Sequence, residues 1–262
     1  MSLETELEDL GLCRTYVVST MEDHRRASTR AHWPKPGPAV TISSQTGAGA
    51  HEIARQLATL LQKDEPGEGP AWTVFDRQLV EKVLEEHHLA KDLAKHMPED
   101  RRSFIRDSMD ELLGLRPPSW VMVPQIAETV LHLAEAGHVI LVGRGANFVT
   151  ARMPNIFHVR LIASLPKRIE RVQKANGLPR DEAAKFVSHT DRGIGRYART
   201  HFHGRVQDDL LYHLVVNTDR IPPPQAAELI AAGARLFFKC STTASPRQNG
   251  ALNPDRNAKK MP

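Results

Sequence analysis

Short apolar runs alternate along this chain with stretches in which apolar residues recur at helical spacing. Each run has the length of a strand and predicts a buried one; the five runs lie at residues 39–43, 72–75, 138–143, 156–162 and 212–217. The helical patterns lie between and after them, at about residues 53–61, 78–136, 165–175, 180–202 and 222–235. Because parallel strands need long crossover connections, this order predicts an α/β fold with a five-stranded parallel sheet and helices on both faces.

The two ends of the chain lack this alternation. Residues 1–36 are charged and patternless and finish in a proline-rich stretch, which predicts a flexible N-terminal extension. Residues 240–262 are rich in Ser, Thr, Asn, Pro and Lys, and they hold too little apolar surface to offset the entropy of ordering. We therefore expect a disordered tail there and a single domain over residues 37–239.

Composition narrows the classes of partner. The chain has 262 residues, with 35 Lys and Arg against 31 Asp and Glu; its net charge of +4 suits an anionic small molecule and is too scattered for a nucleic-acid groove. The two cysteines, Cys13 and Cys240, lie near opposite ends, which excludes a disulfide framework and favours a reducing compartment. No apolar run approaches the roughly 18–20 residues that span a bilayer, and no secretory signal pattern is present. We expect a cytoplasmic protein without membrane or nucleic-acid partners.

The turn after the first predicted strand carries the strongest chemical signal. In open parallel sheets this turn commonly binds phosphate, because it leads into the positive end of a helix. Gly47 and Gly49 allow positive φ angles and a close approach of the backbone, so that successive N–H groups can point at an anion. A tight turn that binds nothing is the alternative interpretation.

The match of this turn to a P-loop is partial. Ser44 stands where the first glycine of the motif would be, Gly49 fits the second, and Ala50 occupies the lysine position. That lysine normally bridges donor phosphates while their charge redistributes. Catalysis at this turn would therefore need cations from other parts of the chain.

Several arginines follow later strands at suitable places. Arg144 lies between two glycines at the end of the third predicted strand. Arg168 and Arg171 share one face of the helix after the fourth strand, and Arg192 and Arg196 lie in the next helix. Because ligands bind at the carboxyl edge of such sheets, these cations could converge on an anion at the turn.

The order of these segments resembles the nucleoside monophosphate kinases, and most closely the cytidylate kinase-like family. The resemblance spans about residues 38–235 and rests on five motifs: the glycine-rich turn at 43–54, Asp-Arg-Gln-Leu at 76–79, Gly-Arg-Gly at 143–145, the arginines of 191–196 and Leu-Tyr-His-Leu-Val-Val-Asn-Thr at 211–218. It implies a P-loop NTPase-like three-layer fold. It also implies a monophosphate-binding insertion at about 76–136 and a lid at about 176–205.

The resemblance assigns roles to individual residues. The loop that holds the donor phosphates would comprise Ser44, Thr46, Gly47, Ala48, Gly49, Ala50 and His51. The acceptor nucleotide would contact Asp76, Arg77, Arg144 and Arg168. Arg144 would clamp the acceptor phosphate, while Arg192 and Arg196 would close over the transferring phosphoryl group, so these three are the expected catalytic residues. Asn217 and Thr218 would border the donor base.

The leading hypothesis is a phosphotransferase that moves the γ-phosphoryl group of ATP to a nucleoside monophosphate such as CMP or dCMP and requires Mg²⁺. A nucleotide-binding regulatory protein without turnover is the alternative, since Ala50 and Glu52 make the loop degenerate. A kinase for a different small acceptor is a third hypothesis. The closest pairs among the 13 histidines lack the spacing of a helical zinc site, so we assign no residue to a metal.

Overall fold

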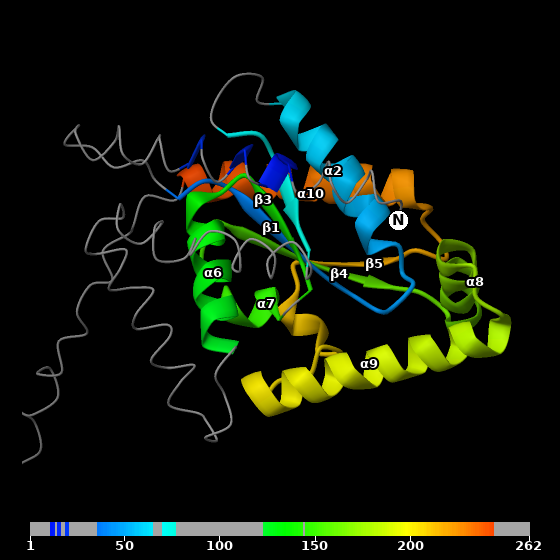
Figure 1. The fold of residues 1–262 in the computed structure, drawn as a ribbon. Coiled ribbons are helices and arrows are strands. Elements are labelled where there is room, and N and C mark those ends of the chain that lie inside the picture. The colour runs from blue at the N-terminus through cyan, green and yellow to red at the C-terminus, as the bar shows by residue number, and fades with distance from the viewer. Residues whose placement is uncertain are drawn as a thin grey trace, which may run out of the picture.

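The computed structural model describes residues 11–13, 15–16, 19–20, 36–64, 70–76, 123–143 and 145–243. Its centre is a five-stranded sheet in the order β2-β3-β1-β4-β5 (Figure 1). The strands are β1 (Ala39–Ser44), β2 (Thr73–Phe75), β3 (Val139–Val142), β4 (Ile156–Ile162) and β5 (Leu214–Asn217). Every neighbouring pair is parallel, which confirms the predicted sheet.

Helices cover both faces of the sheet, as Figure 1 shows. The helices are α2 (Ala50–Asp64), α6 (Val123–Ala136), α7 (Ala146–Val149), α8 (Leu165–Asn176), α9 (Arg180–Phe202), a 3₁₀ turn η1 (Asp209–Leu211) and α10 (Pro223–Thr243). Helices α2 and α10 pack on one face, α6 and α7 on the other, and α8 stands where β4 ends (Figure 1). None of the helices within the described residues is long and apolar enough to cross a membrane.

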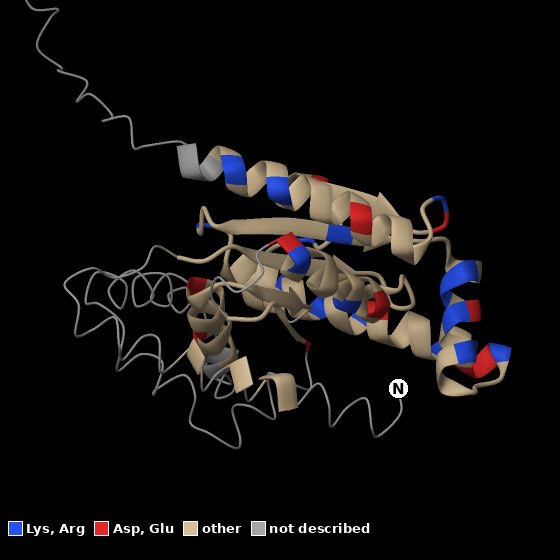
Figure 2. Ribbon diagram, turned by 90° about the horizontal axis from the view of Figure 1, so that it is seen from above, with Lys and Arg blue, Asp and Glu red and all other residues tan. Residues whose placement is uncertain are grey.

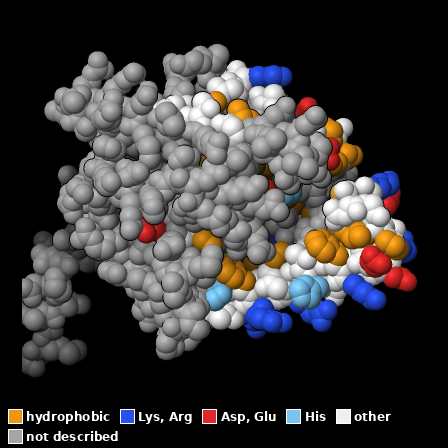
Figure 3. Space-filling model, in the orientation of Figure 1, with side chains coloured by type: hydrophobic (Ala, Val, Ile, Leu, Met, Phe, Trp, Pro, Cys, Tyr) orange, Lys and Arg blue, Asp and Glu red, His pale blue; other side chains and the backbone are white. Residues whose placement is uncertain are grey.

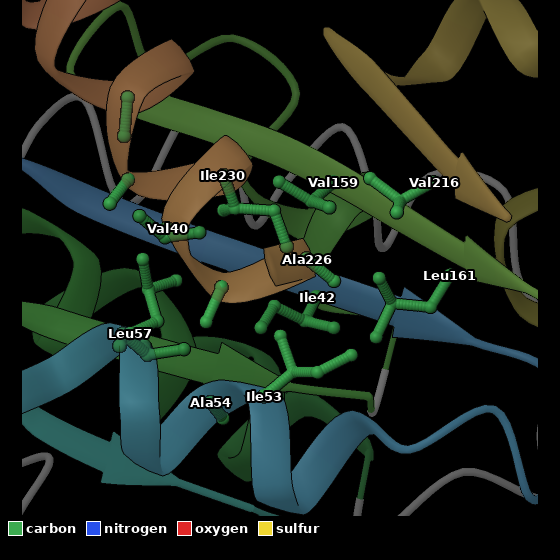
Figure 4. Packing of buried hydrophobic residues seen from close by; sticks show 14 of the residues in the cluster. Val40, Ile42, Ile53, Ala54, Leu57, Val159, Leu161, Val216, Ala226 and Ile230 are labelled. Carbon is green, nitrogen blue, oxygen red and sulfur yellow. The ribbon is translucent and has the colours of Figure 1, made fainter. Parts of the chain in front are cut away.

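The alternation of side chains along β1 divides the core into two clusters. Val40 and Ile42 point toward α2 and α10, where they meet Ile53, Leu57 and Ile230 (Figure 4). All five side chains are fully buried. Burying each of these side chains stabilises the fold by about 1.5–3 kcal/mol. This packing therefore fixes α2, and the turn that leads into it, against the sheet.

The opposite face of β1 and β4 carries polar side chains toward the carboxyl end. Thr41 lies opposite His158 in the parallel register, and Ser43 lies opposite Arg160. All four are buried, with at most 9% of any of them exposed. A buried polar stripe needs internal hydrogen-bond partners, so this end of the sheet is a candidate for chemistry.

Helix α10 is longer than the sequence pattern predicts. We expected helix over residues 222–235 and a disordered tail from residue 240, but α10 continues to Thr243. Phe237 and Phe238 account for the difference because they pack against the core cluster and lie within 5.5 Å and 6.5 Å, ring centre to ring centre, of Phe157 and Trp72. The boundary at residue 240 is therefore wrong by about one helical turn.

Part of the N-terminal segment belongs to the core, which the pattern of residues 1–36 does not indicate. Cys13 and Tyr16 are buried, at 0% and 3% exposed, in the cluster that includes Phe75. The Tyr16 ring meets Phe75 edge to face at 5.5 Å, and its hydroxyl donates a hydrogen bond to the carbonyl of Gly137. At these positions the expectation of a flexible extension is wrong.

The expected insertion at 76–136 is described only at its two ends. Asp76 follows β2, and α6 begins at Val123. Val130 and Leu131 of α6 are buried in the core, so this helix belongs to the body of the domain. The remaining residues of the insertion, including Arg77, lie outside the described residues.

Candidate functional site

The turn between β1 and α2 has the left-handed backbone that its glycines allow. Gly47 has φ 82° and Gly49 has φ 89°. A Cβ at Gly47 would lie 2.5 Å from the carbonyl oxygen of Arg168, so no side chain fits there. The turn leads directly into α2, whose first N–H groups have no partner within the helix and are the donors that an anion at a helix N-terminus commonly binds.

The start of the turn is fixed to the end of β4. The Gln45 amide donates to the Leu161 carbonyl at 3.0 Å, and the Gln45 side-chain oxygen accepts from the Ala163 amide at 2.9 Å. Within the turn, the Ala48 amide donates to the Gln45 carbonyl at 3.0 Å. These bonds preorganise the turn without any ligand.

Arg168 of α8 supports the turn from behind. It is 7% exposed, and its Nε donates to the Ala163 carbonyl at 3.1 Å. Its Nη1 donates to the Thr46 carbonyl at 3.2 Å and pairs with Asp191 Oδ2 at 2.6 Å. These contacts are within the protein, and the substrate contact expected for Arg168 stays a prediction.

Asp191 of α9 holds one amide of the turn, a contact that the sequence pattern does not reveal. Its Oδ1 accepts from the Thr46 N–H at 2.9 Å while its other oxygen pairs with Arg168. The Thr46 hydroxyl, in contrast, is buried without a hydrogen-bond partner in the described part of the chain. The carboxylate therefore joins the expected lid helix to the loop, which retains one unsatisfied hydroxyl.

Arg171 joins the end of β5 to the same turn. Its Nη1 and Nη2 donate to the Thr218 hydroxyl at 2.8 Å and the Thr218 carbonyl at 2.7 Å. The Thr218 hydroxyl in turn donates to the Ala48 carbonyl at 3.0 Å. The structure thus places Thr218 against the loop, whereas its expected role beside a donor base stays a prediction.

The structure also brings Asp76 to the start of α2. Asp76 is 6% exposed at the end of β2, and its Oδ2 lies 3.5 Å from Nδ1 of His51. Two of the expected site residues thus meet, one from the loop and one from the segment expected to bind the acceptor. No group of three His, Cys, Asp or Glu side chains that could hold a metal ion by itself occurs among the residues described.

The structure describes two of the three arginines expected to be catalytic. Arg144 lies outside the described residues, between Gly143 and Gly145, which both have positive φ. Arg192 and Arg196 are exposed on α9, on the side away from its buried residues Ala183, Val187 and Ala198. In Figure 3, basic and histidine side chains line the lower exposed side of the molecule, where Figure 1 places α9. Their catalytic role stays a prediction.

A polar cluster at Arg160 was not foreseen. Arg160 is 4% exposed, and its Nη1 donates to Ser43 Oγ at 2.9 Å. Its guanidinium carbon lies 5.6 Å from the centre of the Tyr212 ring. The Tyr212 hydroxyl is 3.0 Å from the Val206 carbonyl and 3.5 Å from the amide nitrogen of Asn147. In the sequence, Arg160 is a single charged residue within a predicted strand. The cluster is revealed only by the strand register, which places Arg160 opposite Ser43.

Two stacked imidazoles lie beside this cluster. His158 Nδ1 is 2.7 Å from the Thr41 hydroxyl, and the His158 backbone N–H donates to His213 Nδ1 at 2.9 Å. Burial, with a smaller contribution from His213, lowers the pKa of His158 to about 4. Burial also lowers the pKa of His213. Both rings are therefore neutral near pH 7.

A cleft of about 610 Å³ lies along the second half of α2 and beside β2, away from the turn. Arg55, Thr59 and Trp72 are among its lining residues. None of the expected site residues lines it, so we place the candidate site at the turn.

The combination of a parallel α/β sheet and a glycine turn at the start of its first crossover helix defines a P-loop kinase-like fold. The family model described as the cytidylate kinase-like family matches residues 39–220. The chain belongs to that family, whose members are kinase-like nucleotide-binding proteins. A comparison with curated proteins found no relative.

Solved structures align with this chain at low sequence identity. An uncharacterized protein from Eubacterium ventriosum aligns with a TM-score of 0.58 and 15% identity, over 78% of this chain and 98% of its own. A shikimate kinase from Bacteroides thetaiotaomicron aligns with a TM-score of 0.37 and 16% identity, over 77% of this chain and 98% of its own. The first of these similarities supports the fold alone.

Proposed function

We propose that this protein is a phosphotransferase that moves the γ-phosphoryl group of ATP to a nucleoside monophosphate such as CMP or dCMP. An oxygen of the acceptor phosphate attacks the γ-phosphorus, and the bond from that phosphorus to the β-bridging oxygen breaks to release ADP. The observation that carries the proposal is the preorganised turn with Gly47 and Gly49 at the N-terminus of α2, in a chain of this family.

The cations of this site divide into two groups. Arg168 and Arg171 hold the loop in place and have their donors directed at protein oxygens. With Ala50 in the lysine position, the charge that develops during transfer falls to Arg144, Arg192 and Arg196. Asp191 of α9 already contacts the loop, whereas Arg192 and Arg196 are exposed to solvent, so part of α9 has to reorient toward the loop when substrates bind.

The residues at the turn suit a magnesium ion bound together with a nucleotide. Mg²⁺ commonly takes one or two protein carboxylates plus phosphate oxygens and water. Asp76, whose buried carboxylate lies beside the first turn of α2, would hold the ion, and the Thr46 hydroxyl, which lacks a partner among the described residues, would add a further oxygen. When bound, the ion would neutralise charge on the donor phosphates. Asp76 also orients His51.

Two features of the loop favour the alternative of a nucleotide-binding regulatory protein without turnover. The Asp191 carboxylate already accepts the hydrogen bond of the Thr46 N–H. Because Ala50 stands in the lysine position, the loop also lacks its usual ammonium group. A loop of this kind binds phosphate less strongly and supports transfer only if the lid arginines compensate. A reducing, cytoplasmic location suits both functions, because neither Cys13 nor Cys240 is in a disulfide.

The test is a coupled assay of ADP release with ATP, Mg²⁺ and a panel of nucleoside monophosphates and other small acceptors. We expect turnover with CMP or dCMP, and we expect Arg192→Ala or Arg196→Ala to lower kcat by about 10²–10³-fold, the usual effect of removing one preorganised charge contact. Arg180→Ala, at the start of the same helix, is the matched control and should keep native kcat.

Binding of ATP without ADP release for any acceptor would support the regulatory protein and contradict the kinase. Turnover confined to an acceptor that is not a nucleotide would support a different small-molecule kinase. Activity that survives in both lid variants would remove the lid arginines from the mechanism.

A further inference from the structure

Three arginines approach the turn, and their hydrogen bonds differ. A guanidinium group has five N–H donors. Arg168 and Arg171 each make three hydrogen bonds to protein oxygens. Arg160 makes one, to Ser43 Oγ, within the part of the chain that the structure describes. Most of its donors are thus without a protein acceptor there.

The burial of Arg160 makes this shortage costly. Only 4% of the residue is exposed, and no carboxylate pairs with it among the described residues. Removing a cation from water without a counter-ion is strongly unfavourable, and the Tyr212 ring at 5.6 Å compensates for only a small part of that cost. An anion with several oxygens would accept the remaining donors and supply the missing charge.

Neighbouring groups hold Arg160 in a fixed position. Ser43 Oγ accepts from Arg160 and lies 3.2 Å from the Tyr212 hydroxyl, which also lies 3.0 Å from the Val206 carbonyl. The Asn147 side-chain amide donates to the same hydroxyl at 3.5 Å. The contact with Ser43 holds the edge of the guanidinium that carries Nη1. No other Arg160 nitrogen is among the fully buried atoms of the described residues that lack a partner, so these donors keep access to a ligand.

The cluster lies on the side of β1 opposite to α2. Ile42 points toward α2, and the next side chain, Ser43, points to the other face, where α6 and α7 pack. The donor phosphates are assigned to the N-terminus of α2. An anion held by Arg160 is therefore a second anion, on the face of the sheet opposite to α2.

We propose that Arg160 binds the phosphate monoester group of the acceptor, with Ser43 and Tyr212 as its positioning residues. The inference rests on the proposed kinase function and adds a residue that the loop and lid motifs do not contain. Arg160 gives the site a fixed positive charge for the acceptor phosphate. This charge adds to that of the arginines on α9. Acceptors without an anionic group would then bind poorly.

The experiment compares the full chain with Arg160→Met, which keeps the length of the side chain and removes its charge. Binding of CMP, inorganic phosphate and ATP is measured by calorimetry, and the thermal midpoint is measured with and without each. We expect Arg160→Met to weaken CMP binding by about 10- to 100-fold, as the loss of one or two charge-assisted hydrogen bonds implies, and to leave ATP binding within about twofold. Arg235→Met, on α10, is the matched control and should bind CMP as the native chain does.

The thermal midpoint separates ligand binding from a structural role. If Arg160 serves a ligand, Arg160→Met without ligand should unfold at the native temperature or above it, because a buried unpaired charge has been removed. A marked fall in that midpoint, native CMP affinity in Arg160→Met, or no affinity of the native chain for CMP or phosphate would overturn the inference. If Arg160→Met keeps native turnover and native CMP affinity, only this inference is wrong. If CMP binding depends on Arg160 but the native chain shows no turnover, only the proposed kinase function is wrong.

Discussion

His158 shows how a single buried residue sets the response of this fold to pH. The ring sits between the Thr41 hydroxyl and the stacked ring of His213, whose centre is 5.3 Å away. Burial, together with the charge that His213 would acquire, disfavours the imidazolium form and lowers the pKa of His158 to about 4. The unfolded chain binds that proton near pH 6.5, so between these two values the unfolded state holds more protons than the folded state.

Stability should therefore decline as the pH falls from about 6.5 to about 4, by roughly 3–4 kcal/mol at most for this group, since each pKa unit corresponds to about 1.4 kcal/mol. Above pH 6.5 the contribution of His158 is constant. Urea unfolding at a series of pH values measures this, and His158→Gln should flatten the profile over that window. An equally steep decline in the variant would show that other groups cause it.

At the scale of elements, α8 and α9 form a hairpin that is attached to the loop at its base. Arg168 of α8 and Asp191 of α9 pair with each other and bond to the carbonyl and the N–H of Thr46. Figure 2 shows the basic positions of α8 at the end of the molecule, interspersed with acidic ones, so this hairpin is not a uniformly basic surface. The Thr46 contact couples the position of the lid helix to the shape of the loop.

Removing this contact with Asp191→Ala leaves the Arg168 guanidinium buried beside an unpaired amide. The side chains of Arg168 and Asp191 are 9% and 29% exposed, so solvent screens the pair partly. We expect the free energy of unfolding to fall by about 1–3 kcal/mol, below the cost for a fully buried pair. Urea denaturation measures this change.

The matched control is Glu170→Ala, which removes two ion pairs, with Lys167 and Lys174, on the exposed side of α8. Exposed pairs of this kind contribute little, so this variant should unfold at nearly the native urea concentration. Equal effects from the two variants would mean that the contact between α9 and the loop is not a special feature.

For the whole molecule, the sequence pattern predicts most of the fold because the core is layered. The five apolar runs form the strands of one parallel sheet, because helical segments separate them along the chain. Other parts depend on contacts between distant residues. Tyr16 joins the core through contacts with Phe75 and Gly137. The end of α10 joins it through contacts with Phe157 and Trp72, and no local sequence pattern encodes such contacts.

The site divides in the same way. The turn is predictable because Gly47 and Gly49 are needed wherever the backbone takes positive φ. Asp191 and Arg160 are not, since the first meets Thr46 across 145 residues and the second meets Ser43 across 117. The packing of α9 against the loop brings Asp191 to Thr46, and the register of β1 and β4 brings Arg160 to Ser43.

The most direct test of the central claim is calorimetric titration of the full chain with Mg²⁺ and ATP, comparing the native protein with Gly47→Ala and Gly193→Ala. A Cβ at Gly47 would lie 2.5 Å from the Arg168 carbonyl at φ 82°, whereas one at Gly193, within α9, would meet nothing within 4 Å. We predict saturable ATP binding that Gly193→Ala preserves and Gly47→Ala weakens by about tenfold or more, because the amides no longer converge. Absence of binding by the native chain, or native affinity in Gly47→Ala, would contradict the assignment of this turn as the phosphate site.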